Sequence, residues 1–190
     1  MKVLLKNLAL QSGLRVAGPV FFMGMQVSSL NTAKTILINK TVGSLSPLPF
    51  MSLFVNCVVW SFYGYLRGDL TVLIPNLSGA LVGLLCSSVY QYFCSETPAN
   101  LYLITTSLIL ASSVLFAGRN FKFLGYLGCS LAIILMGSPL ATLKTVISEK
   151  STASLPFWTS VSTWLNALSW SLYGIFVAGD GMVISTFLLL

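Results

Sequence analysis

Charged side chains divide the chain into long apolar stretches. The seven longest stretches between successive charges cover residues 16–33, 41–66, 70–95, 97–118, 123–143, 151–179 and 181–190. Six of them contain 18 to 29 residues, and the last contains 10. A helix of about 20 apolar residues crosses a hydrocarbon core of ~30 Å. The pattern therefore predicts a polytopic membrane protein whose helices lie near residues 13–33, 49–66, 70–93, 100–118, 122–143, 156–177 and from 181 onward, the seventh being incomplete.

The composition agrees with a membrane protein. Only 7% of the residues are charged, whereas an average soluble domain has about 25%. This excludes a soluble enzyme, a nucleic-acid binder and a disordered tail. The net charge of +6 is spread as one or two cations at each span boundary, so it does not indicate a nucleic-acid partner. The four cysteines show no C-x-x-C spacing, so neither a zinc site nor a disulfide framework is predicted.

The chain contains an internal repeat. A shift of 110 positions places Gly18 on Gly128 and the motif Asn-x-x-x-Trp-Ser-x-Tyr-Gly at 56–64 on its copy at 166–174. Further along the chain the shift becomes 111, which aligns the Gly-Asp pairs at 68–69 and 179–180. Equivalent helices are four crossings apart, an even number, so both copies point in the same direction.

The repeat predicts an all-α membrane protein built of two parallel three-helix-bundle repeats that are joined by a linker helix. The first repeat covers residues 13–93, the linker covers 100–118, and the truncated second repeat covers 122–190. Parallel repeats of this kind are a known plan of transporters, which hold the substrate between the repeats near the midplane of the membrane.

No predicted span has a His, Asp, Glu or Lys at a central position. Proton- and ion-coupled transporters usually need titratable groups within the membrane, and acid–base or covalent catalysis needs a base. We therefore expect an uncharged substrate that moves downhill, without enzymatic chemistry, cofactor or metal.

Three asparagines, Asn56, Asn76 and Asn166, lie within the apolar helices. An unpaired amide in such a medium costs several kcal/mol, so each is expected to face a partner or a water-filled cavity. Amide donors and acceptors suit the hydroxyl groups of a sugar. The alternative is a hydrogen bond between helices, which we favour for Asn56 and Asn166. Substrate contact is favoured for Asn76, because Pro75 removes a backbone donor beside it.

Trp60 and Trp170 occupy equivalent positions in the two repeats. Indole faces are good platforms for the C–H faces of a sugar ring, and the alternative is a place in the interfacial aromatic belt. Trp158 and Trp164 have no counterparts in the first repeat, so packing or the belt is expected for them.

Two glycines are candidates for a contact between helices, and three prolines are candidates for hinges. Gly79 and Gly83 have the G-x-x-x-G spacing of a helix-contact surface. Pro49, Pro139 and Pro156 lie near span ends at one predicted membrane face and are hinge candidates. An ordinary helix-start proline is the alternative for Pro49 and Pro156.

These motifs resemble the SWEET family of sugar transporters over roughly residues 13–185. In the first repeat the similar segments are Ser46-Pro47-Leu48-Pro49-Phe50, the 56–64 motif, Gly68-Asp69 and Pro75-Asn76. In the second they are Ser138-Pro139-Leu140, Lys150-Ser151, Pro156-Phe157 and Trp170-x-x-Tyr173-Gly174. Trp60, together with Ser29 in place of a first-span proline, is similar to the animal branch of the family.

The resemblance implies facilitated, bidirectional transport of a mono- or disaccharide by alternating access. It implies a pocket with Asn76, Trp60 and Trp170, and an outer gate of Tyr63 with Asp180. Three of the family's four hinge prolines are matched, and Ser29 replaces the fourth. We expect a sugar as substrate, the lipid bilayer as surroundings, a homo-oligomer, and the plasma membrane as location, with the Golgi membrane as the alternative.

The second repeat departs from the family pattern at its end. Phe187, or Thr186 with a one-residue gap, stands where the family has a second asparagine. Ten residues follow Asp180, which is about 15 Å of helix. Two alternative functions follow: a non-transporting truncated variant that oligomerises with and modulates a full-length transporter, or a related carrier of other uncharged solutes.

Orientation follows from the family rather than from charge. With the N-terminus outside, four cations face the cytoplasm and six face outward, which is opposite to the positive-inside rule. Asn39-Lys40-Thr41 is a glycosylation acceptor sequence on the predicted cytoplasmic side. A glycan on Asn39 would therefore reverse the predicted topology.

Overall fold

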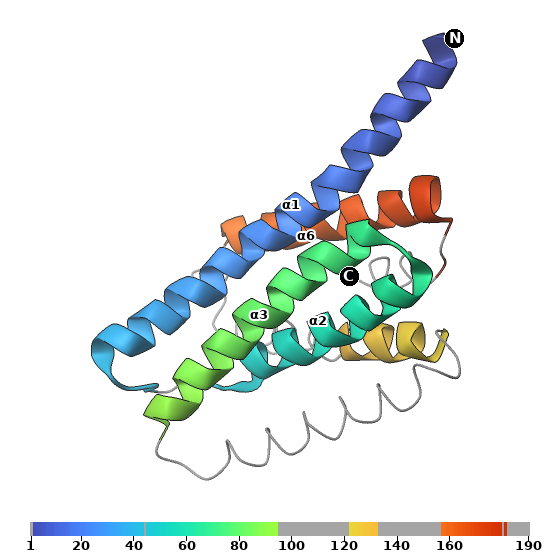
Figure 1. Ribbon diagram of the computed structural model, residues 1–190. Coiled ribbons are helices and arrows are strands. Elements are labelled where there is room, and N and C mark those ends of the chain that lie inside the picture. The colour runs from blue at the N-terminus through green and yellow to red at the C-terminus, as the bar shows by residue number, and fades with distance from the viewer. Residues whose placement is uncertain (1, 44, 95–121, 133–156, 180, 182–190) are drawn as a thin grey trace, which may run out of the picture. The chain divides into compact units, whose positions relative to one another are not determined.

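The computed structural model describes residues 2–43, 45–94, 122–132, 157–179 and 181, and each regular element among them is a helix (Figure 1). The predicted linker helix at 100–118 and nearly all of the predicted seventh span lie outside these residues. So do several residues with predicted roles, namely Pro139, Pro156, Asp180, Thr186 and Phe187.

Helix α1, Lys2–Asn39, contains 38 residues and is much longer than the predicted 13–33. Its length corresponds to about 57 Å, which exceeds a hydrocarbon core of ~30 Å. The prediction was too short because it used the apolar stretch alone. Lys6, Gln11 and Lys34 lie outside the predicted span but favour helix, so they do not end it. The helix ends where Lys40 adopts a positive φ of 54°.

Helices α2, Leu48–Arg67, and α3, Leu70–Phe93, agree with the predicted spans to within one residue. Both are long and apolar enough to cross a membrane, and they are the two such helices among the described residues. Pro49 lies in the first turn of α2, where its missing N–H costs nothing. This position fits the alternative of an ordinary helix-start proline, and the hinge role stays a prediction.

A tight turn joins α2 to α3. Gly68 ends α2 in the left-handed conformation, with φ of 67°, and its N–H donates to the carbonyls of Gly64 and Tyr65. Asp69 then caps α3, because its Oδ1 accepts from the N–H groups of Thr71 at 3.0 Å and Val72 at 3.3 Å. The Gly-Asp pair therefore ends one helix and begins the next.

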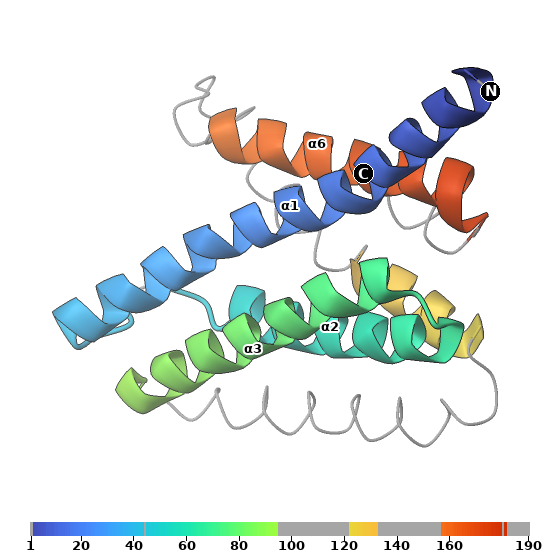
Figure 2. The ribbon, with the colours of Figure 1, turned by 45° about the horizontal axis from the view of Figure 1, so that its top comes forward.

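Helices α2 and α3 pack side by side (Figure 2). A β-carbon at Gly83 would lie 2.7 Å from the backbone nitrogen of Phe54, and one at Gly64 would lie 2.9 Å from that of Leu73. Both distances are too short for a real side chain, so the two backbones meet at glycines. The predicted helix-contact role is thereby confirmed for Gly83.

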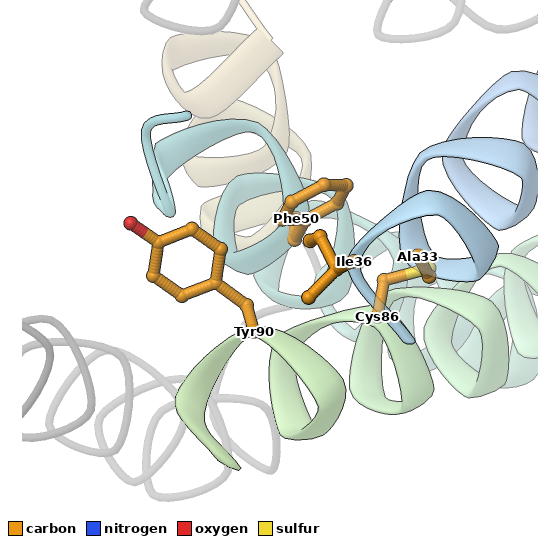
Figure 3. Close-up of a cluster of buried hydrophobic side chains, with 5 residues drawn as sticks. All are labelled: Ala33, Ile36, Phe50, Cys86 and Tyr90. Carbon is orange, nitrogen blue, oxygen red and sulfur yellow. The ribbon is translucent and has the colours of Figure 1, made fainter. Parts of the chain in front are cut away.

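Residues Gln26–Gly128 form one of two compact units. The apolar cluster in this unit joins α1, α2 and α3, and consists of Ala33, Ile36, Phe50, Cys86 and Tyr90 (Figure 3). The Tyr90 hydroxyl extends beyond the cluster and donates to the carbonyl of Leu45 at 2.7 Å. This bond ties α3 to the loop before α2.

The second compact unit combines residues Met1–Met25 with Cys129–Leu190. It contains the first part of α1, helix α6 at Phe157–Tyr173, and the short π-helix η1 at Gly174–Ala178. Together α6 and η1 agree with the predicted span 156–177. The division between the units falls inside α1, so the compact units cut across the predicted repeats.

Large apolar side chains are exposed on every labelled α-helix whose side chains are described. Trp164 on α6 is 62% exposed, so the packing alternative is wrong for it and a lipid-facing position fits. An exposed apolar surface of this extent suits a bilayer rather than water.

Candidate substrate site

Trp60 lies on α2, and its indole ring lies directly on the backbone of the helical segment 122–132. A β-carbon at Gly128 would be 2.9 Å from both Cε2 and Nε1 of the ring. The same indole packs in a T-shaped arrangement with Tyr63, with ring centroids 5.2 Å apart and ring planes at 73°. Trp60 is 5% exposed, so the ring is enclosed by these neighbours.

Trp170 on α6 repeats this arrangement in the other compact unit. A β-carbon at Gly18 of α1 would be 3.1 Å from Cδ2 and Cε2 of its ring. Tyr173 meets the indole edge-on, with centroids 5.7 Å apart and planes at 89°. Trp170 is 4% exposed. We call Gly128 with Trp60, and Gly18 with Trp170, the glycine–tryptophan pairs.

Asn56 and Asn166 lie four residues before Trp60 and Trp170. The Oδ1 atom of each is buried and has no hydrogen-bond partner, within the part of the chain that the structure describes. An unsatisfied buried acceptor costs about 1–3 kcal/mol. Interhelical hydrogen bonding, which we favoured for these two residues, is therefore not seen at either oxygen.

Asn76 is buried on α3, directly after Pro75. Its Nδ2 donates to the carbonyl of Val72 at 2.8 Å, within its own helix. This bond uses one of the two N–H groups of the amide. Pro75 removes the backbone donor that would bond the carbonyl of Thr71, so the helix is less tightly bonded beside Asn76.

Gln26 on α1 is a buried amide to which the sequence analysis assigned no role. Its Oε1 accepts from the Oγ of Ser78 at 3.5 Å, and its Nε2 has no partner among the described residues. The signal was available, because Gln26 and Asn31 are the two amides within the charge-free stretch 16–33, and Gln26 is near its middle. Its repeat counterpart, Met136, is apolar.

The predicted gate is only partly described. Tyr63 is one of the most deeply buried side chains, and it packs against Trp60. Its predicted partner Asp180 lies outside the described residues. Asp69, which is the repeat equivalent of Asp180, caps α3 with its carboxylate. The pairing of Tyr63 with Asp180 therefore stays a prediction.

The unit Gln26–Gly128 thus contains Asn56, Trp60, Tyr63 and Asn76, whereas Asn166 and Trp170 belong to the other unit. Each set combines neutral amides with an aromatic ring. Among the described residues, no group of three His, Cys, Asp or Glu side chains could hold a metal ion. Such an arrangement can accept and donate hydrogen bonds and stack on a C–H face, but it offers no nucleophile with a base.

Comparison with known families gives a consistent result. The family model described as "Sugar efflux transporter for intercellular exchange" matches residues 12–98 and 122–190. "Sugar transporter SWEET1" of Xenopus tropicalis is 34% identical over 166 residues, which cover 82% of this chain and 76% of that protein. The human protein of the same name is 31% identical over 180 residues, which cover 88% of this chain and 80% of that protein.

Plant relatives and a solved structure extend the comparison. "Bidirectional sugar transporter SWEET7" of Arabidopsis thaliana is 27% identical over 84% of this chain and 67% of that protein. A solved structure of a eukaryotic SWEET transporter is 24% identical, covers 94% of this chain and 89% of that chain, and has a TM-score of 0.82. This likeness confirms the predicted all-α membrane fold.

Proposed function

The chain belongs to the SWEET family of transporters, and from this premise we propose that it moves sugar across a membrane by uncoupled, bidirectional, facilitated diffusion. The family is not an enzymatic one, in agreement with the prediction that this chain catalyses no reaction. Within the proposal, the substrate is a hexose or small saccharide and the mechanism is alternating access.

The Oδ1 atoms of Asn56 and Asn166, which have no hydrogen-bond partner among the described residues, are the observation that supports this proposal most directly. A neutral polyhydroxylated substrate can donate a hydrogen bond to an oxygen of this kind and remove the cost of leaving it unsatisfied. Asn76 offers its remaining N–H to a sugar oxygen. None of these groups is charged, so binding requires neither a proton nor an ion.

Trp60 and Trp170 are each proposed, on the family resemblance, to offer an indole surface to the C–H groups of a sugar. Each ring has one region against a glycine, and the proposal assigns a different region of the ring to the substrate. Both rings are at most 5% exposed. The substrate therefore reaches them in a conformation in which neighbouring side chains have withdrawn, as alternating access requires.

The proposal includes a homo-oligomer in the plasma membrane with the N-terminus outside. These three parts of the proposal are supported by the family resemblance alone. Hinge roles for Pro49, Pro139 and Pro156 and the gate of Tyr63 with Asp180 belong to it in the same way. The alternative of a non-transporting modulator has no support from the comparisons. A carrier of another uncharged solute remains the second candidate, because Asn56 and Asn166 would accept from other hydroxylated solutes as well.

The test measures flux of labelled glucose into liposomes that contain the purified chain. Flux should be saturable and unaffected by an imposed pH gradient. Asn56→Ala and Asn166→Ala should each raise KM about 3- to 10-fold, the value of one neutral hydrogen bond. Asn76→Ala should abolish flux at unchanged expression.

Asn31→Ala is the matched control, because Asn31 is exposed on α1 and should leave KM unchanged. Thermal stability separates the two interpretations of Asn56 and Asn166. Removal of an unsatisfied buried oxygen should not destabilise the protein, whereas loss of an interhelical bond should. Accumulation of sugar driven by a proton gradient would contradict the proposal.

A further inference from the structure

The proposed function gives Trp60 and Trp170 direct contact with the sugar, and the present inference rests on that role. We infer that Gly18 and Gly128 are positioning residues for these two tryptophans. Each glycine lets an indole ring lie on helix backbone, and this contact sets the plane that the ring presents to the substrate.

Both contacts involve the rigid part of the indole. The nearest ring atoms to a β-carbon at Gly128 are Cε2 and Nε1 at 2.9 Å; at Gly18 they are Cδ2 and Cε2 at 3.1 Å. Favourable contacts between carbon atoms lie near 3.5–4.0 Å. These atoms belong to a fused ring rather than to the end of a flexible chain, so the whole ring would have to tilt to admit a methyl group.

A second contact limits such a tilt. Each indole packs in a T-shaped arrangement with a tyrosine three residues further along its own helix, Tyr63 for Trp60 and Tyr173 for Trp170. Both tyrosines are among the most deeply buried large side chains that the structure describes. Each indole is thus held by a glycine backbone and a buried aromatic ring, and a displaced ring would have to displace both neighbours.

The other described glycines of α1 nearest to Gly18 make no such close approach. Gly13 and Gly24 lie on α1 on either side of Gly18, and a β-carbon at either of them would meet nothing within 4 Å. An alanine should therefore be tolerated at both positions. These two residues provide controls on the helix that contains Gly18.

The pairs exchange partners between the repeats. Gly18 belongs to the first predicted repeat and contacts Trp170 of the second, while Gly128 of the second contacts Trp60 of the first. The orientation of the tryptophan in either repeat therefore depends on the first helix of the other repeat. Substitution of one glycine should weaken the substrate contact made by the opposite repeat.

The test compares Gly128→Ala, Trp60→Phe and the double variant in the liposome assay. Gly128→Ala should raise KM for glucose about tenfold while the maximal rate per folded transporter changes less than about twofold. Trp60→Phe makes room for the methyl group, so the double variant should have the KM of Trp60→Phe alone. Gly18→Ala with Trp170→Phe should behave in the same way, with a smaller effect because the contact is longer.

Gly13→Ala and Gly24→Ala should leave KM unchanged. If Gly128→Ala is not recovered folded, recovery of the double variant supports the inference and failure of the double variant opposes it. An unchanged KM in Gly128→Ala, or a rise that persists undiminished beside Trp60→Phe, would overturn the positioning role. If Trp60→Ala and Trp170→Ala leave KM unchanged, the substrate role of the tryptophans in the proposed function fails instead.

Discussion

The ends of α2 and of α6 with η1 derive from equivalent motifs, yet they close differently. In the first, the N–H of Gly68 donates to the carbonyl of Gly64, four residues earlier. In the second, the N–H of Gly179 donates to the carbonyl of Gly174, five residues earlier. Both glycines adopt the left-handed conformation. Gly179 and Gly174 are the repeat equivalents of Gly68 and Gly64, so equivalent residues form the capping bond in both repeats, with one additional residue between them in the second.

This difference explains why the shift between the repeats changes from 110 to 111. A π-helical turn absorbs a single inserted residue without unwinding the helix around it. The insertion therefore leaves both partners of the capping bond in place. The α-helical end is tied to α3 by the close contact at Gly64, and the other end contains a π-helical turn, so we expect the two ends to tolerate changes in length differently.

Deleting one exposed apolar residue from each end should give the largest difference. Loss of Leu66 would break the bond from Gly68 to Gly64 and rotate Asp69 by about 100°, away from the start of α3. We expect a loss of about 2–4 kcal/mol in the apparent free energy of unfolding. Loss of Phe176 would give the second end the spacing of the first, and should cost less than about 1 kcal/mol.

Thermal unfolding in detergent, followed by size-exclusion chromatography, measures both deletions. Leu66 and Phe176 are both exposed, so the apolar area that is lost is comparable. Equal losses in the two variants would contradict the view that the π-helical turn accommodates an additional residue.

A methyl group at Gly64 should have the next largest effect. Its β-carbon would lie 2.9 Å from the backbone nitrogen of Leu73, which cannot move without shifting α3. Overpacking of this kind costs about 1–3 kcal/mol, and the melting temperature should fall by several degrees. Gly13→Ala, which meets open space, is the control. A melting temperature equal to that of the control would show that α2 and α3 can separate at this point.

Loss of the capping carboxylate should have the smallest effect. Asp69→Ala should cost about 1 kcal/mol, and Asp69→Asn should cost less because its amide oxygen can still accept from Thr71 and Val72. The same pair of substitutions at Asp180 tests whether the second repeat begins its last helix in the same way. A loss on Asp180→Ala that Asp180→Asn shares in full would indicate a charge-dependent role, such as the predicted gate with Tyr63, whereas a loss that Asp180→Asn does not share would indicate a cap.

Much of the fold could be predicted from the sequence because it depends on local pattern. The bounds of α2 and α3 follow from apolar stretches that end at Gly68-Asp69 and at the polar residues after Phe93. The length of α1 could not be predicted from hydropathy, because Lys6, Gln11 and Lys34 are polar residues outside the apolar span that still belong to the helix. The membership of the SWEET family, which the repeated motifs indicated, is confirmed by the comparisons.

The site could be predicted less completely. Asn56, Asn76 and Asn166 were found because an amide in an apolar helix is conspicuous in any sequence. The hydrogen bonds of these three amides could not be predicted, because the partners of an amide depend on which helices lie beside it. The favoured interhelical bond of Asn56 and Asn166 is absent at Oδ1 among the described residues, and the amide of Asn76 turns back to Val72.

The sequence by itself determined that this chain is a membrane protein with an internal repeat, that its candidate substrate groups are uncharged, and that Gly18 and Gly128 occupy equivalent positions. These properties depend on residue type and spacing alone. Only the tertiary structure decided that each of these glycines lies under the tryptophan of the other repeat, and that one additional residue is absorbed as a π-helical turn. Contacts between helices depend on which segments meet in space, and spacing along one chain does not specify that.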